Sequence, residues 1–74
     1  MTVSTLHSRI LSKNGYNVVV IYKGYSIDSV DYELWSGRDN DIPIELINKE
    51  VVDWVVNWSS NAPETEAVLT IVVH

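Results

Sequence analysis

Two groups of carboxylates are the residues whose types and spacing could do chemistry. Residues 39–41 (DND), followed by Glu45, form a dense acidic stretch of the kind that could bind calcium. A calcium loop, however, needs oxygen ligands at alternate positions, a glycine at its sharp turn and a bidentate glutamate beyond it. Ile42 and Pro43 interrupt the series, and no glycine follows Asp41. We therefore expect a solvated loop in which Asp41 caps the next turn, and no metal site.

The second group of carboxylates, Asp28, Asp31 and Glu33, lies in a segment that we expect to be a strand. Asp31 and Glu33 would project from the same face, and paired carboxylates can do acid–base chemistry when one is desolvated. That face is the polar one, because the alternate positions 30, 32 and 34 are apolar. Exposed charges that prevent edge-to-edge pairing of strands are therefore the simpler explanation.

A nucleophile needs a base within hydrogen-bond reach and a third group that holds the base. His7, Ser8 and Ser12 are close in sequence, but residues 1–23 contain no acid. The chain has no cysteine, and His7 and His74 lack the spacing of zinc ligands. Its three glycines are isolated and form no phosphate-binding loop. We expect a protein without catalytic activity, metal or cofactor.

Composition and charge narrow the class of protein. Seventy-four residues, 46% hydrophobic and 20% charged, are typical of one small globular domain. The net charge is −5, with basic residues scattered singly, so the chain is poorly suited to neutralise phosphates and we expect no direct nucleic-acid binding. The apolar runs are far shorter than the ~20 residues that cross a bilayer, and the N-terminal stretch lacks the apolar core of a secretory signal. We expect a cytoplasmic protein that does not enter membranes.

The elements that would position these residues follow from apolar periodicity and turn residues. In chain order, the pattern predicts a helix at 5–13 capped by Ser4 or Thr5, a strand at 16–22, a tight reversal at Lys23-Gly24, a strand at 25–35 with a bulge near 28–29, a loop at 36–41, a turn at 43–47 and a strand at 67–73. Strand 16–22 is apolar on both faces except at Asn17, which is typical of a central strand or of a strand that is covered on both sides.

Segment 51–58 (VVDWVVNW) is compatible with an amphipathic helix or with a strand. Valine and tryptophan occupy six of its eight positions, and both are better strand formers than helix formers. We therefore predict an α+β fold in which one N-terminal helix packs on a four-stranded, mainly antiparallel sheet. The alternative is an α-β-β-α-β order with a helix at 44–60. The predicted core consists of Leu6, Ile10, Val18, Val20, Leu34, Trp54, Val56, Leu69 and Ile71.

Part of the chain shows a family resemblance. The pattern is Ile42-Pro43-x-x-Leu46-Ile47-x-x-x-Val51-x-x-Trp54, followed by Leu69-Thr70-Ile71-x-Val73. Over about 32 residues it resembles the C-terminal half of small proteins commonly encoded in phages and prophages of Gram-positive bacteria. In those proteins the first piece is a short turn, and the following segments pair as a hairpin. Because most of them have no assigned activity, the resemblance implies a compartment, the host cytoplasm, and no catalytic residue.

One helix cannot cover both faces of such a sheet, so apolar surface would remain open for contact with a protein. Our hypothesis is a small acidic interaction protein that binds a host or phage protein or self-associates. The candidate partner-binding residues are Val51, Val55, Asp28, Asp31, Glu33, Asp39 and Asp41. A sharper version uses the acids to inhibit a host nucleic-acid-binding or defence protein. The alternatives are an assembly component that self-associates through sheet edges, and a weak enzyme or metal-binding protein.

Overall fold

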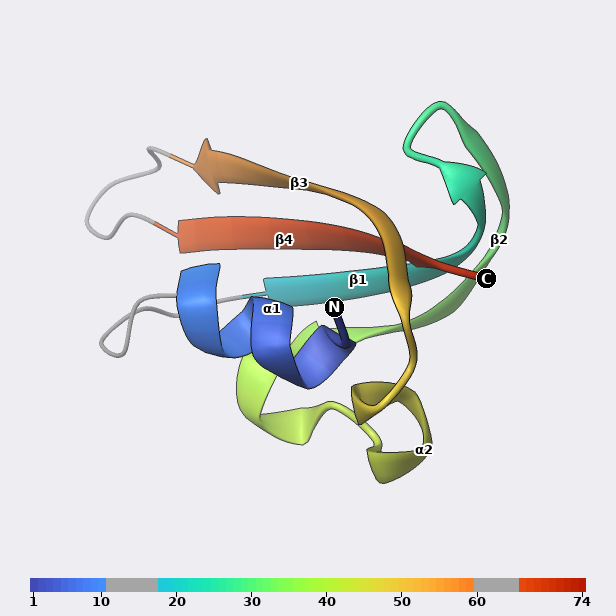
Figure 1. Cartoon of the computed structure of the whole chain (residues 1–74). Coiled ribbons are helices and arrows are strands. Elements are labelled where there is room, and N and C mark those ends of the chain that lie inside the picture. Colours follow the sequence, from blue (N-terminus) through green and yellow to red (C-terminus); the bar gives the residue numbers. More distant parts are fainter. Residues whose placement is uncertain (11–17, 60–65) are drawn as a thin grey trace.

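Four strands form one mixed sheet in the computed structural model, which describes residues 1–10, 18–59 and 66–74. The strands are β1 (Val18–Ser26), β2 (Ser29–Arg38), β3 (Val51–Ser59) and β4 (Glu66–Val73). Their order across the sheet is β2-β1-β4-β3. The β1–β2 and β3–β4 pairs are antiparallel, and the central β1–β4 pair is parallel (Figure 1). The predicted α+β class is therefore confirmed, and β1 is a central strand as its two apolar faces indicate.

The segment that sequence left ambiguous is a strand. Residues Val51–Ser59 pair with β4 as β3, so the alternative helix at 44–60 is wrong. The short helix α2 (Ile44–Ile47) precedes β3 and ends at Asn48. Valine and tryptophan side chains lose rotamer freedom against a helical turn, whereas a pleated sheet accommodates them. This preference for a strand explains why residues 51–59 do not continue the helix.

The N-terminal helix α1 (Val3–Ile10) begins two residues earlier than predicted. The expected caps are wrong, because the hydroxyl of Thr2 accepts a hydrogen bond from the backbone N–H of Thr5 at 3.3 Å. Threonine at this position satisfies one of the N–H groups that the first helical turn leaves without a partner. The earlier start places Val3 inside the helix and makes it a core residue. Predicted residues 11–13 lie outside the described part.

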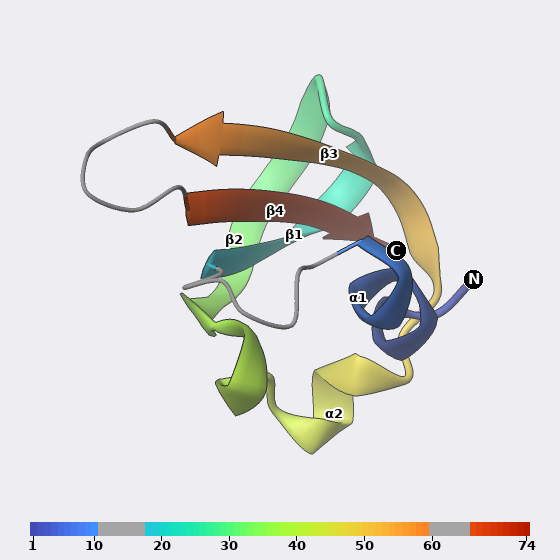
Figure 2. The same ribbon diagram turned by 90° about the vertical axis from the view of Figure 1, so that its left-hand side faces the viewer.

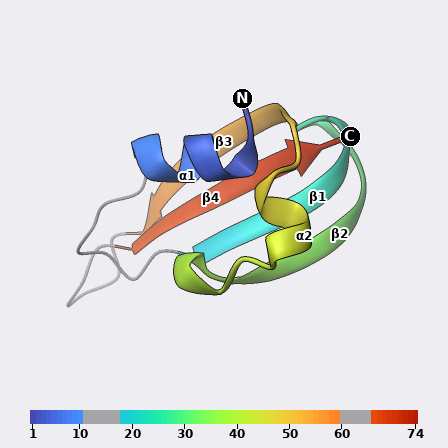
Figure 3. The same cartoon turned by 60° about the horizontal axis from the view of Figure 1, so that its bottom comes forward.

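Both helices lie on the same face of the sheet (Figures 2 and 3). The connection from β2 to β3 crosses that face through a 3₁₀ turn, η1 (Asp39–Asp41), and α2. Two backbone hydrogen bonds join it to the start of α1, from Val3 N to Lys49 O at 3.0 Å and from Val51 N to Met1 O at 2.8 Å. The predicted capping role of Asp41 is wrong, because Pro43 is the N-cap of α2 and no side chain caps it.

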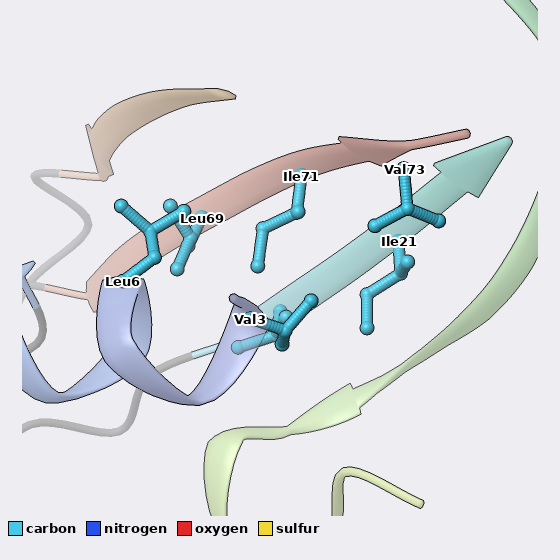
Figure 4. Close-up of a cluster of buried hydrophobic side chains, with 7 residues drawn as sticks. Val3, Leu6, Ile21, Leu69, Ile71 and Val73 are labelled. Carbon is cyan, nitrogen blue, oxygen red and sulfur yellow. The ribbon is translucent and has the colours of Figure 1, made fainter. Parts of the chain in front are cut away.

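A cluster of buried side chains joins α1 to the two central strands (Figure 4). Its members are Val3, Leu6, Val19, Ile21, Leu69, Ile71 and Val73. Three of the residues predicted to be in the core, Leu6, Leu69 and Ile71, are buried there, and Val56 packs against the cluster. The core thus lies between the helices and one face of the sheet, which we call the helix face.

Several other core predictions are wrong. Val18 and Val20 alternate with Val19 and Ile21 along β1, so they lie on the opposite face of the sheet. A strand with apolar residues on both faces gives no sequence signal for which face meets the helix. Leu34 and Trp54 are 37% and 41% exposed, respectively. The side chain of Ile10 lies outside the described part of the chain.

The turn of the first hairpin lies at residues 27–28, beyond the predicted reversal at Lys23-Gly24. Gly24 is instead a strand residue at a register shift between β1 and β2. A Cβ atom at this position would lie 2.6 Å from the carbonyl oxygen of Ser29 and 2.7 Å from the Cα of Val30. The sequence therefore needs glycine here because two backbones approach closely, and not because the chain reverses.

Candidate protein-interaction surface

The strand registers arrange the face opposite the helices into rows of side chains. The first row across the sheet is Arg38-Val18-Val68-Asn57. The second row is Ser36-Val20-Thr70-Val55. The third row is Glu33-Tyr22-Val72-Asp53. Because side chains on a strand alternate between faces, each row continues the same surface.

The tip of the β1–β2 hairpin reaches the third row. The hairpin curls toward β3 at the right of Figure 1. The Asp53 carboxylate accepts a hydrogen bond from the backbone N–H of Ile27 at 2.9 Å and another from its neighbour Trp54 at 2.9 Å. Val72, in the same row, is fully buried although it faces away from the helices. The hairpin therefore covers this end of the face, and Asp53 holds it there.

The first two rows form the surface that we call the valine face. Its apolar centre consists of Val18, Val20, Val55, Val68 and Thr70, all partly exposed. Arg38, Ser36 and Asn57 border this centre at the two edges of the sheet and are exposed. Both described helices lie on the other side. An apolar centre within a polar border is the usual anatomy of a protein–protein interface.

The two edges of the sheet differ in how well they are protected against pairing with another chain. β2 carries Asp31 and Glu33, and its pairing with β1 is broken by register shifts. β3 carries a single charge, Asp53, and its register shift lies at its start, between Val51 and Asp53. The run from Trp54 to the end of β3 contains neither a charged residue nor a register shift. Because charges and bulges are what protect edges, this part of β3 is the less protected edge.

The structure separates the two valines that sequence placed together. Val55 lies on the valine face opposite Thr70, as predicted. Val51 pairs with Val73 and packs against the core, so its placement on the same face is wrong. The register shift after Val51 inserts one extra residue into β3, which moves Val51 to the helix face. Sequence alone did not reveal this bulge.

The predicted acidic residues do not gather on one face. Asp28 is at the turn of the β1–β2 hairpin, whereas Asp39 and Asp41 are in η1, beyond the other end of β2. Asp31 and Glu33 are exposed between these ends. Asp39 is also engaged, because its carboxylate Oδ2 lies 3.2 Å from Nε2 of His7 in α1, with the two side chains 16% and 27% exposed. Asp39 therefore joins α1 to η1.

Sequence reasoning missed Val18, Val20 and Val68 as candidate surface residues. The first two were assigned to the core, and Val68 was not singled out. The signal for them is the apolar character of both faces of β1 and β4, combined with helices too short to cover both faces. Because the helices can cover only one face, the valines on the other face of β1 and β4 had to remain outside the core.

Other classes of site are less well supported in the described residues. Within 1–10, 18–59 and 66–74, no group of three His, Cys, Asp or Glu side chains is arranged to hold a metal ion. In the same part of the chain, no helix has the length and apolar character needed to cross a bilayer. No protein-family model, curated protein or solved structure matches the chain.

Proposed function

We propose that this chain is a non-catalytic protein-interaction module that acts through the valine face. The observation that carries the proposal is the one-sided placement of the helices on a sheet whose central strands, β1 and β4, are apolar on both faces. Contiguous open apolar surface on a small protein is a mark of protein–protein contact. The resemblance of residues 42–73 to small phage and prophage proteins supports a site of action in the host cytoplasm.

The occupant that we propose for the valine face is a second copy of the same chain. The first two rows contain no carboxylate, although the chain has ten Asp and Glu residues and a net charge of −5. Two acidic molecules repel each other least where neither carries acids. Two-fold symmetry lets the same apolar patch meet itself, as in most homodimers. The apolar centre would be buried, and Arg38, Ser36 and Asn57 would form the rim.

Substitutions on the valine face test this proposal. Val20→Glu and Val55→Glu each place a carboxylate in the apolar centre of both copies, so the dimer should dissociate. Ile44→Glu is the matched control, because Ile44 is 80% exposed on α2, on the other side of the sheet. The mass of each protein is measured by light scattering after gel filtration at protein concentrations from about 1 µM to about 1 mM. This range covers dissociation constants from micromolar to millimolar.

The wild-type protein and Ile44→Glu should approach twice the monomer mass of 8.4 kDa as the concentration rises. Val20→Glu and Val55→Glu should dimerise at least about tenfold more weakly, a difference of about 1.4 kcal/mol. A wild-type protein that stays monomeric throughout would overturn the proposal. So would an equal loss of dimer in Ile44→Glu.

A second candidate function is assembly through the β3 edge, and the uncharged run after Asp53 favours it. Edge pairing extends a sheet from copy to copy through backbone hydrogen bonds. Trp54→Lys separates the two candidates, because Trp54 lies opposite Ile71 on the helix face and not on the valine face. Loss of association in Trp54→Lys, with association retained in Val20→Glu, would favour the edge.

Inhibition of a basic host protein gives a third, distinct outcome. Reversing the charges of Asp31 and Glu33 on β2 should weaken such binding in a salt-sensitive way. The same changes lie outside the valine face and should leave a valine-face dimer intact.

A further inference from the structure

A pocket of about 380 Å³ lies between α2 and the strands β1, β2 and β4. Its lining residues are Lys23, Tyr32, Leu34, Glu45, Leu46, Lys49, Val73 and His74. Val73 and Leu46 belong to the core or pack against it, so the pocket opens on the helix face, away from the valine face. Pockets that bind small molecules in proteins usually span ~300–1,000 Å³. This one is therefore large enough for a small ligand.

The floor of the pocket is apolar and firmly held. Val73 is almost fully buried, and Leu46 packs against the core. Leu34 completes the floor and is 37% exposed, so its side chain has apolar surface left to cover. The nearby backbone of Lys49 is fixed at both ends, because its N–H donates to Leu46 O at 3.1 Å and its carbonyl accepts from Val3 N at 3.0 Å. These parts of the pocket are therefore preformed before any ligand binds.

Two lysines from separate elements line this pocket. Lys23 comes from β1 and Lys49 from the connection between α2 and β3, and they are two of only five Lys and Arg residues in the chain. In the described part of the chain, neither ammonium group takes part in an ion pair. The Lys23 ammonium lies 6.0 Å from the centre of the Tyr32 ring, which keeps it beside the pocket. With Glu45 also in the lining, the two lysines and this acid leave a net positive charge at the pocket.

We propose that the pocket binds a small amphipathic anion, with a carboxylate head between Lys23 and Lys49 and an apolar body on the leucine and valine floor. The volume corresponds to about a dozen water molecules at ~30 Å³ each, which suits a ligand of roughly ten non-hydrogen atoms. Glu45 is the acidic side chain among the lining residues. Its charge offsets one of the two lysines and leaves these three side chains with a net charge of +1, which a monocarboxylate balances.

Octanoate is the probe that tests this site, and octanol is its uncharged counterpart. Binding is followed by backbone amide and methyl NMR shifts of the whole protein. Octanoate should shift the signals of Leu34, Leu46 and Val73, and should bind at least about tenfold more tightly than octanol. Raising the salt from about 0.05 M to about 0.5 M should weaken octanoate binding, because salt screens exposed charges.

Neutral variants identify the charges that matter. Lys23→Met and Lys49→Met remove one charge each and keep an unbranched side chain, and each should weaken octanoate binding about tenfold without changing octanol binding. Arg9→Met, on the exposed side of α1, is the matched control for net charge and should leave octanoate binding unchanged. Glu45→Gln should tighten octanoate binding several-fold. Thermal unfolding of each variant establishes that it is folded.

The site would be refuted if octanoate and octanol bound equally well, because the lysines would then contribute nothing. It would equally fail if the shifts mapped to Val20 and Val55 on the valine face, or if Arg9→Met weakened octanoate as much as the two lysine variants. The dimer test and this test are independent, because the two surfaces lie on opposite sides of the sheet.

Discussion

Replacing Asp53 by alanine tests whether one carboxylate holds the first hairpin over the sheet. The Asp53 carboxylate accepts hydrogen bonds from Ile27, 26 residues away, and from its neighbour Trp54, both at 2.9 Å. A hydrogen bond to a charged group contributes about 1.5–3 kcal/mol. The Trp54 bond is local and next to solvent, so most of the effect should come from Ile27. We expect Asp53→Ala to lower the free energy of unfolding by about 2 kcal/mol.

For a domain of this size, 1 kcal/mol corresponds to about 4–8 °C in Tm, so Asp53→Ala should lower Tm by about 8–16 °C. Asp53→Asn keeps an acceptor oxygen and should lose about half as much free energy, as expected for a neutral hydrogen bond. Circular dichroism measures Tm, and hydrogen exchange reports the Ile27 amide directly. That amide should exchange faster in Asp53→Ala, because its acceptor is gone.

The matched control is Asp31→Ala, which removes the same charge from an exposed position on β2. It should change Tm by only a few degrees, since surface substitutions usually stay within ~0.5 kcal/mol. If Asp31→Ala lowers Tm as much as Asp53→Ala, net charge explains the effect and the hairpin contact does not. Unchanged protection of the Ile27 amide in Asp53→Ala would refute the reasoning as well.

Three further substitutions test the helix face and the hairpin. Leu6→Ala leaves a cavity at a fully buried site and should lower the free energy of unfolding by about 2–5 kcal/mol. That is a large share of the ~4–11 kcal/mol expected for a chain of 74 residues. Urea unfolding measures the change, and a loss below about 1 kcal/mol would contradict the burial. Gly24→Ala places a Cβ 2.6 Å from the carbonyl oxygen of Ser29 and should lower stability by about 1–3 kcal/mol, so an unchanged Tm would show that the two strands can separate there. His7→Ala removes the contact with Asp39 and should lower the free energy of unfolding by at most ~1 kcal/mol. Changes in NMR chemical shift should be confined to α1 and η1. A larger loss of stability would mean that His7 also supports the core.

The sequence predicted where the helices and strands lie along the chain better than it predicted which side of each strand faces the core. The β-branched and aromatic residues of 51–59 and 66–73 mark both strands, and the residue preferences at 51–58 correctly excluded a helix. Which face of β1 meets α1 could not be predicted, because Val18 and Val20 are as apolar as Val19 and Ile21. The choice depends on where α1 packs, and that is a tertiary contact.

The candidate surface was predicted only in part, for the same kind of reason. Val55 was placed on the open face, whereas the bulge after Val51 moved that residue to the core. A one-residue change of register reverses every side chain beyond it, and no residue type in β3 marks where it occurs. Lys23 and Lys49 are 26 positions apart in the sequence, so only the folded chain shows that they share a pocket.

The parallel pairing of β1 with β4 has a consequence for the order in which the protein is made. Among the four described strands, β1 is synthesised first and lies beside β4, which is synthesised last, so β4 must leave the ribosome before the middle of the sheet can close. Until β4 emerges, the valines of β1 have a neighbouring strand on one side only. Pairings between distant segments slow folding and leave such edges open to other chains. Newly made copies translated side by side could therefore meet through these same strands before either is complete.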